Sequence, residues 1–193
     1  MTEPDGHIRH VLMVCSANQC RSPMGAALLR RELHHRDPEV VVASAGVLAR
    51  DGSPATAGTV QAARDFGIDL HGHRSQAATL DVIASSDLVL GMERMHVREA
   101  VVLDPRAFSR SFTLKEIVRR GEEHGPRQPG ETQAQWLAAV HQGRTTVALL
   151  GTSTDDDVAD PTSDLSVDHD SMATEVDDLV LHFVDLLWPD GVE

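Results

Sequence analysis

The sequence predicts an α/β protein in which helices cover both faces of a parallel sheet. Three observations predict this fold class. Short apolar runs alternate along the chain with longer segments of helical periodicity. The first apolar run is followed at once by a short polar loop and a helix-like segment. Hydrophobic residues make up 41% of the 193 residues, enough for a sizeable core, and this length suits a single domain over residues 1–193.

Strands and helices alternate over roughly the first 120 residues. The expected strands are short apolar runs at residues 8–14, 40–44, 87–90 and 111–113. The helices that follow them are expected at residues 23–35, 55–66, 93–102 and 114–120. Ser22 as N-cap and Pro23 in the first helical position favour the first helix start. Gly67 suits the C-cap of the second helix.

The remaining chain carries two more helices separated by loops. Residues 121–130 are rich in Gly and Pro, which predicts a loop, and a helix is expected at residues 131–141. Residues 151–164 are rich in Asp, Ser and Thr, so we expect a surface loop with solvated aspartates at residues 155–157. The last helix, at residues 169–187, has one apolar face that comprises Val176, Leu179, Val180, Phe183, Leu186 and Leu187.

The charge balance limits the classes of partner. Asp and Glu total 30 against 17 Lys and Arg, so the formal net charge is -13. This charge argues against nucleic acids and anionic membranes as partners, although a small local anion site remains compatible. The start of the chain, MTEPDGHIRH, lacks the apolar core of a signal peptide, and the apolar stretches are too short or too interrupted to span a bilayer. We therefore expect a cytoplasmic protein.

The stretch HVLMVCSANQCRSP carries the chemistry. Its strand ends at Cys15, and Arg21 follows after five small or polar residues. A strand, a tight loop and a helix start together favour an anion site, which Arg21 can close with its planar fork. Such surroundings favour the thiolate of Cys15, to which Ser22 can donate a hydrogen bond. The predicted phosphate-binding residues are Ser16, Ala17, Asn18, Gln19, Cys20, Arg21 and Ser22.

The segment CSANQCRSPM resembles the C-x-x-N-x-C-R-S-P loop of the low-molecular-weight protein tyrosine phosphatases, a family that shares its superfamily with arsenate reductases and protein arginine phosphatases. The segments SAG, FGIDLHGHRS, DLVLGM and ADP follow in the family's order. The resemblance implies three layers, with a four-stranded parallel sheet flanked by helices and the phosphate loop between the first strand and helix. Residues 121–154 then look like an insertion, whose Trp136, Leu137 and Val140 are expected to pack onto the body.

The resemblance also implies a mechanism without metal or cofactor. Cys15 attacks phosphorus, Arg21 stabilises the oxygens, and Asp160 is the general acid, because Asp160-Pro161 lies just before the last helix whereas Asp104-Pro105 lies mid-chain. The residues that match the loop's support are Asn18, Ser22, Ser44 and His73. For Cys20, two readings stay open: a reversible disulfide with Cys15, or a small buried residue that packs the loop.

The substrate wall departs from the family pattern. Arg50 and Thr162 stand where aromatic residues commonly wall a phenyl ring, and Gln19 precedes the second cysteine of the loop. The default substrate is a protein phosphotyrosine, with a small or more polar phosphoester as a further possibility. Two alternatives remain: an arsenate reductase that uses a small-molecule thiol, and a non-catalytic regulatory protein that binds phosphate. The oligomeric state is left open.

Overall fold

The computed structural model describes residues 6–164 and 166–191. Four strands form one parallel sheet in the order β2-β1-β3-β4. Their bounds are His10–Cys15 for β1, Val41–Gly46 for β2, Leu88–Gly91 for β3 and Ser111–Thr113 for β4. The predicted parallel sheet is therefore confirmed. Residues 1–5, which begin the polar stretch MTEPDGHIRH, lie outside the described residues.

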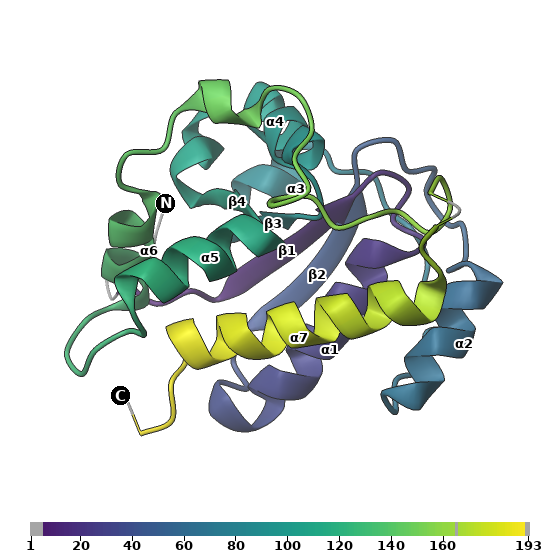
Figure 1. Ribbon diagram of the computed structural model, residues 1–193, viewed down its shortest axis with the longest axis horizontal. Coiled ribbons are helices and arrows are strands. Elements are labelled where there is room, and N and C mark those ends of the chain that lie inside the picture. The colour runs from purple at the N-terminus through teal and green to yellow at the C-terminus, as the bar shows by residue number, and fades with distance from the viewer. Residues whose placement is uncertain (1–5, 165, 192–193) are drawn as a thin grey trace.

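Helices cover both faces of this sheet (Figure 1). The α-helices are α1 (Arg21–Arg36), α2 (Ala57–Asp65), α3 (Leu80–Ala84), α4 (Arg94–Leu103), α5 (Leu114–His124), α6 (Gln133–His141) and α7 (His169–Leu187). Two 3-10 helices, η1 (Pro105–Arg110) and η2 (Thr146–Leu149), complete the set. The packing of α1, α5 and α7 on one face and of α3 and α4 on the other confirms the three layers.

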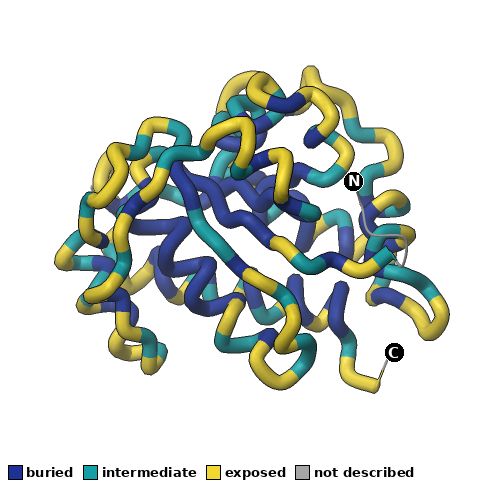
Figure 2. Tube along the Cα trace, turned by 180° about the vertical axis from the view of Figure 1, so that it is seen from behind, coloured by how far each residue is buried: buried dark blue, intermediate teal, exposed yellow. Residues whose placement is uncertain are grey.

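The alternation of side chains along β1 explains why both faces are covered. Val11 and Met13 pack into the cluster that contains α1 and α7, whereas Leu12 and Val14 pack into the cluster with α3 and α4. All four are at most 1% exposed. A strand that buries both faces in this way reads as a continuous apolar run. Figure 2 shows the result as buried chain running through the centre of the molecule.

Three expected elements differ in the structure. The helix α5 continues to His124, so the loop predicted from residue 121 begins only at Gly125. A side chain at Gly121 would meet Trp136 and Leu186 within about 3 Å, so this glycine permits close packing instead of ending the helix. The short helix α3 was not predicted. Ser22 is not the N-cap of α1, which begins at Arg21.

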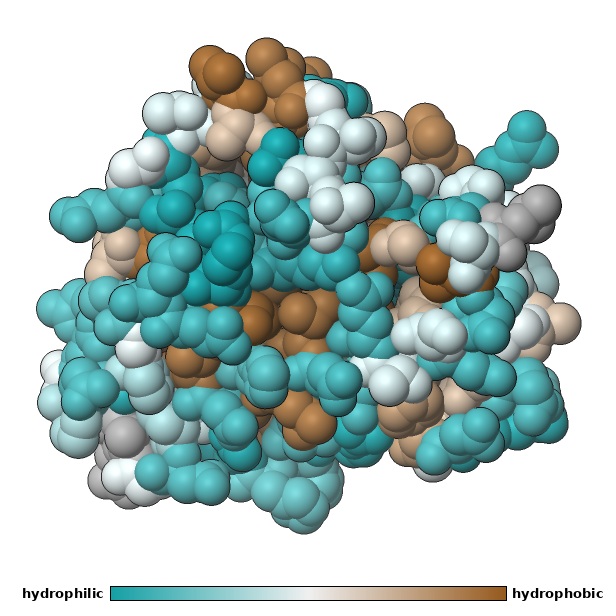
Figure 3. All heavy atoms as spheres, viewed as in Figure 1, coloured by the Kyte–Doolittle hydropathy of each residue, from teal (hydrophilic) through white to brown (hydrophobic). Residues whose placement is uncertain are grey.

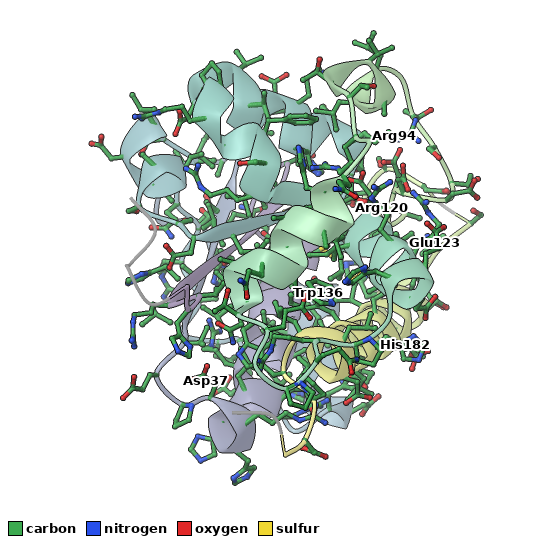
Figure 4. All side chains as sticks on the ribbon, turned by 90° about the vertical axis from the view of Figure 1, so that its left-hand side faces the viewer. Asp37, Arg94, Arg120, Glu123, Trp136 and His182 are labelled. Carbon is green, nitrogen blue, oxygen red and sulfur yellow. The ribbon has the colours of Figure 1, made fainter. Side chains whose placement is uncertain are left out.

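The segment from residue 121 to residue 154 packs against the rest of the domain. Trp136, Leu137 and Val140 are buried, as predicted, and Trp136 points from α6 into the molecule (Figure 4). Further along, Arg144 donates to both carboxylate oxygens of Glu116 at 2.7 and 2.9 Å. Its guanidinium carbon also lies 4.0 Å from the centre of the Phe112 ring. That this segment is an insertion stays a prediction.

We expect Arg144→Met to lower the free energy of unfolding by about 3–5 kcal/mol, because the Glu116 carboxylate would stay buried without its cation. The side chains of Arg144 and Glu116 are only 3% and 10% exposed. Urea unfolding measures this free energy. As a control, Arg98→Met breaks the exposed pair with Glu99 and should lower the free energy of unfolding by about 1 kcal/mol or less. If Arg144→Met lowers the free energy of unfolding by no more than Arg98→Met does, the prediction is contradicted.

Apolar side chains are also exposed at the end of the molecule formed by α4 and η2. Val102, Leu103, Val147 and Leu150 are 40–70% exposed there. Figure 3 shows this group as brown spheres at the top of the molecule. Within the described residues, no helix combines the length and apolar composition needed to cross a bilayer.

The topology determines where a site can form. The chain passes from β1 to β2 on one side and then returns to β3 on the other, so the strand order reverses between β1 and β3. In open parallel sheets the crevice outside the carboxyl ends at such a point is the usual ligand site. Cys15 ends β1 there, and the turn into α4 follows β3. A separate cavity of about 650 Å³ lies at the amino ends of the strands, near His10 and Asp87.

Candidate active site

Residues 16–20 link β1 to α1 and curl around the thiol of Cys15. Asn18 adopts φ = 55°, a left-handed conformation that asparagine tolerates. This turn brings the Asn18 N–H to 3.3 Å from Cys15 Sγ. Ser22 Oγ lies 3.0 Å from the same sulfur, and Cys15 is 3% exposed. The loop therefore holds the buried sulfur within hydrogen-bond distance of the Asn18 N–H and the Ser22 hydroxyl.

Four carbonyl groups in this region accept hydrogen bonds from residues outside the loop. Those of Cys15, Ser16, Asn18 and Gln19 accept hydrogen bonds of 2.7–3.0 Å from Val47 N–H, Leu48 N–H, His73 Nε2–H and Thr56 N–H respectively. In a trans peptide the N–H points away from the C=O of the preceding residue. The N–H groups of the following residues, 16, 17, 19 and 20, are thereby directed to the inner side of the loop. This arrangement suits an oxyanion.

Asn18 is the centre of the predicted loop support. Its Nδ2 donates to Ser22 Oγ and to Ser44 Oγ, both at 2.9 Å. Its Oδ1 accepts the N–H of Gln76 at 2.9 Å, so each polar atom of this buried side chain has a partner. The four residues predicted as support, with His73 on the Asn18 carbonyl, are therefore in contact in the structure.

Gly46, at the end of β2, permits this close fit. A side chain there would lie 2.5 Å from the Ser16 carbonyl oxygen and 2.7 Å from the Asn18 nitrogen. Any Cβ would push the loop away from the sheet.

Arg21 closes the loop from the first turn of α1. Its side chain is 1% exposed and contacts Glu93 through Nη1. Nη1 also donates to the Val158 carbonyl at 2.8 Å, and Nη2 donates to Asp160 Oδ2 at 2.7 Å. The three residues predicted to be catalytic, Cys15, Arg21 and Asp160, line one small cavity of about 130 Å³.

The carboxylate of Asp160 is held in its charged form in this state. Burial raises its pKa, but hydrogen bonds from Thr162 and the charge of Arg21 outweigh burial and bring the pKa below the usual range. Thr162 contributes both its N–H, at 2.9 Å, and its hydroxyl, at 2.7 Å, to Oδ1. The residue therefore orients the carboxylate as well as lining the cavity.

The other predicted residues divide between the cavity and its surroundings. Ala17, Gln19 and Cys20 line the cavity together with Thr56, which was not predicted, and no aromatic side chain is among the residues that line it. The exposed Arg50 does not line this cavity; its carbonyl oxygen accepts a hydrogen bond from Ser75. Its role in a substrate wall stays a prediction.

Cys20 is free and buried. Burial, more than any other influence, raises the pKa of its thiol to about 11. The residue is therefore a protonated thiol at neutral pH, in keeping with a packing role. Its pairing with Cys15 on oxidation stays a prediction.

Two site residues on the N-terminal turn of α4 were not predicted. Glu93 contacts Arg21, and His96 Nδ1 accepts the Glu93 N–H at 3.0 Å. The imidazole proton must then be on Nε2, which lies 3.0 Å from Ser16 Oγ and donates to it. Burial and then the charge of Arg21 lower the pKa of His96 to about 3, so this ring is neutral at physiological pH. The turn after β3 thus supports both Arg21 and the loop.

The wider chain resembles known phosphatases. The model of the low molecular weight phosphotyrosine protein phosphatase family matches residues 10–142. The probable low molecular weight protein-tyrosine-phosphatase EpsP of Ralstonia nicotianae is 38% identical over 110 residues, which are 57% of this chain and 73% of that protein. A protein-arginine-phosphatase of Geobacillus stearothermophilus is 39% identical over 108 residues, 56% of this chain and 70% of that protein.

The fold agrees with these matches. A crystal structure of the low molecular weight protein tyrosine phosphatase from T. tengcongensis superimposes with a TM-score of 0.67 at 27% identity and covers 92% of this chain and 98% of that chain. The family match includes Cys15 and Arg21 and ends before Asp160. The parallel sheet and these relatives agree with the family match, so the chain belongs to the low molecular weight protein-tyrosine-phosphatase family of cysteine-based phosphatases.

Proposed function

We propose that Cys15, Arg21 and Asp160 hydrolyse phosphomonoesters through a phosphocysteine intermediate. The sulfur of Cys15 forms a bond to phosphorus while the bond between phosphorus and the leaving oxygen breaks. The leaving oxygen takes its electron pair and a proton from Asp160. Water then attacks phosphorus and gives a proton to the Asp160 carboxylate, and the thiolate leaves. Phosphate is released, and both residues return to their first state.

The convergence of these three side chains on one cavity carries the proposal. The inward N–H groups of the loop and the fork of Arg21 suit the equatorial oxygens of a transferring phosphoryl group. A phosphate dianion would compete with Asp160 for Arg21 and add negative charge beside the carboxylate. Both changes raise the pKa of Asp160, so we expect substrate binding to supply the protonated acid that the first step requires.

The substrate class follows from the rim of the cavity. Its polar and small side chains include Gln19, Thr56 and Thr162. An aromatic wall contributes about 0.5–1.5 kcal/mol per stacked ring, so its absence from the lining limits the preference for phosphotyrosine. We take a protein phosphotyrosine as the default substrate and a more polar phosphoester as the second. A cytoplasmic location stays a prediction, as do the absence of a metal or cofactor and the absence of nucleic-acid or membrane partners.

The two alternatives receive no support from these observations. The matched relatives are named as phosphatases, which favours neither arsenate reduction with a small-molecule thiol nor phosphate binding without catalysis. A binding protein would also have no need of a carboxylate held 2.7 Å from the loop arginine.

Asp160→Asn is the direct test of the acid. We expect kcat/KM for phenyl phosphate to fall by about 10²–10³-fold, because the phenolate would leave without a proton. Dinitrophenyl phosphate, whose leaving group is weakly basic, should lose about threefold or less in kcat/KM. Steady-state kinetics with both esters measures this contrast. Equal losses for the two esters would contradict the assignment of Asp160 as the acid.

A further inference from the structure

The chain that leads to Asp160 is tied down at three consecutive residues, 156–158, which we call the strap. Solvated aspartates are predicted at residues 155–157, and of these three Asp156 is buried whereas Asp155 is exposed and Asp157 partly so. Asp156 is only 5% exposed and Val158 only 1%. A buried carboxylate needs partners of opposite charge, and the structure supplies two.

Asp156 binds two arginines from different helices. Arg94 of α4 donates from Nε at 2.8 Å and from Nη2 at 2.6 Å to Oδ2, and Arg119 of α5 donates to Oδ1 at 3.0 Å. Arg94 lies beside the segment that leads to α7 (Figure 4). Because α4 and α5 cover opposite faces of the sheet, Asp156 joins the two helical layers at the carboxyl ends of the strands.

The next two residues extend the strap to the site. Asp157 Oδ1 accepts the backbone N–H of Arg94, at the N-terminus of α4, at 2.7 Å. The Val158 N–H donates to the Met92 carbonyl at 2.7 Å, and the Val158 carbonyl accepts Arg21 Nη1 at 2.8 Å. Arg21 therefore holds the strap and, two residues further on, the carboxylate of Asp160.

This arrangement matters most when substrate is bound. Among the described residues, the Asp160 carboxylate accepts hydrogen bonds from Arg21 and from its own neighbour Thr162. A substrate phosphate would take N–H groups of Arg21 from Asp160. The strap would keep its contacts with α4 and α5 while phosphate is bound to Arg21. These contacts would then hold Asp160 beside the leaving oxygen.

We propose that Asp156 is the positioning residue for the general acid: through Arg94 and Arg119 it fixes the strap, and the strap fixes Asp160 beside the leaving group. This inference rests on the proposed role of Asp160. It assigns to Asp156 no contact with substrate and no proton transfer.

The experiment compares kcat/KM for phenyl phosphate and dinitrophenyl phosphate in Asp156→Asn, Arg94→Met and the double variant. We expect the single variants to lose about tenfold on phenyl phosphate and about twofold or less on dinitrophenyl phosphate, because only the step that needs the acid is impaired. The double variant should lose no more than Asp156→Asn alone, since that change already disturbs the contact that Arg94→Met removes.

Matched controls separate this effect from general damage. Asp155 is the exposed neighbour of Asp156, and Asp155→Asn should leave both rates unchanged. Thermal unfolding identifies a variant that fails to fold. If Asp156→Asn is such a variant, Arg94→Met carries the test alone, because that side chain is partly exposed.

The outcomes distinguish the two proposals. Equal losses on both esters in a folded Asp156→Asn, or no loss on either, would overturn the positioning role while Asp160→Asn still shows its contrast. If Asp160→Asn itself shows no contrast between the esters, the proposed acid fails, and the positioning role fails with it.

Discussion

Cys15→Ser is expected to abolish turnover, with a loss of about 10⁴–10⁶-fold in kcat, while inorganic phosphate still binds. The serine hydroxyl is not ionised at neutral pH and is a much weaker nucleophile than a thiol, so the attacking group is lost. The inward N–H groups of residues 16–20 and the guanidinium of Arg21 remain in place, so the phosphate site is unchanged. Steady-state kinetics and calorimetric titration with phosphate measure the two parts of this prediction.

Both parts must hold together. Residual turnover above about 1% of the parent rate would mean that another group attacks phosphorus, since losing a nucleophile costs far more than this. Loss of phosphate binding together with turnover would indicate that the substitution disturbs the loop, in which Cys15 Sγ accepts the Asn18 N–H.

Arg21→Lys is expected to have the next largest effect, a loss of about 10³-fold in kcat/KM together with weaker phosphate binding. A lysine is a single point charge, whereas the Arg21 fork serves Glu93, Val158 and Asp160 at once. The lysine would present one ammonium group, whereas the phosphoryl oxygens are best bound by two parallel N–H donors. Kinetics with phenyl phosphate and titration with phosphate measure the loss.

A matched arginine controls for the change of side chain. Arg98 on α4 is partly exposed and pairs with its neighbour Glu99, away from the cavity of Cys15, so Arg98→Lys should leave both rate and binding unchanged. Arg21→Lys within about tenfold of the parent would show that charge alone suffices, contrary to the role given to the fork.

Much of the fold follows from local sequence pattern. The strand β1 is recognisable because its apolar run is buried on both faces, and α7 has the predicted bounds because its apolar face repeats regularly from Met172 to Leu187. The end of α5 could not be predicted, because Gly121 reads as a helix breaker. Only the tertiary contact with Trp136 and Leu186 explains why a glycine lies inside this helix.

The loop of residues 16–20, which we propose binds phosphate, was predictable for the same local reason. Its thiol, its tight turn and its arginine lie within one strand, loop and helix start, where spacing alone indicates the arrangement. The strap was not predictable, because Asp156 pairs with Arg94 and Arg119, which precede it by 62 and 37 residues. In the sequence, the aspartates at residues 155–157 resemble those of any solvated acidic loop.

Glu93 and His96 were less predictable than the loop after β1 but more predictable than the strap. No motif indicates them, but the strand order places the turn after β3 next to the loop after β1. A prediction that included this order would have directed attention to the polar residues that follow Gly91.

The most direct test of the account is to trap the covalent intermediate. In Asp160→Asn the second step lacks its base, so dinitrophenyl phosphate should phosphorylate the enzyme faster than water removes the phosphoryl group. Rapid quenching, digestion and mass spectrometry with fragment-ion sequencing are expected to find one phosphoryl group on Cys15 and none on Cys20. Turnover without any phosphorylated residue, or a phosphoryl group on a residue other than Cys15, would contradict the account.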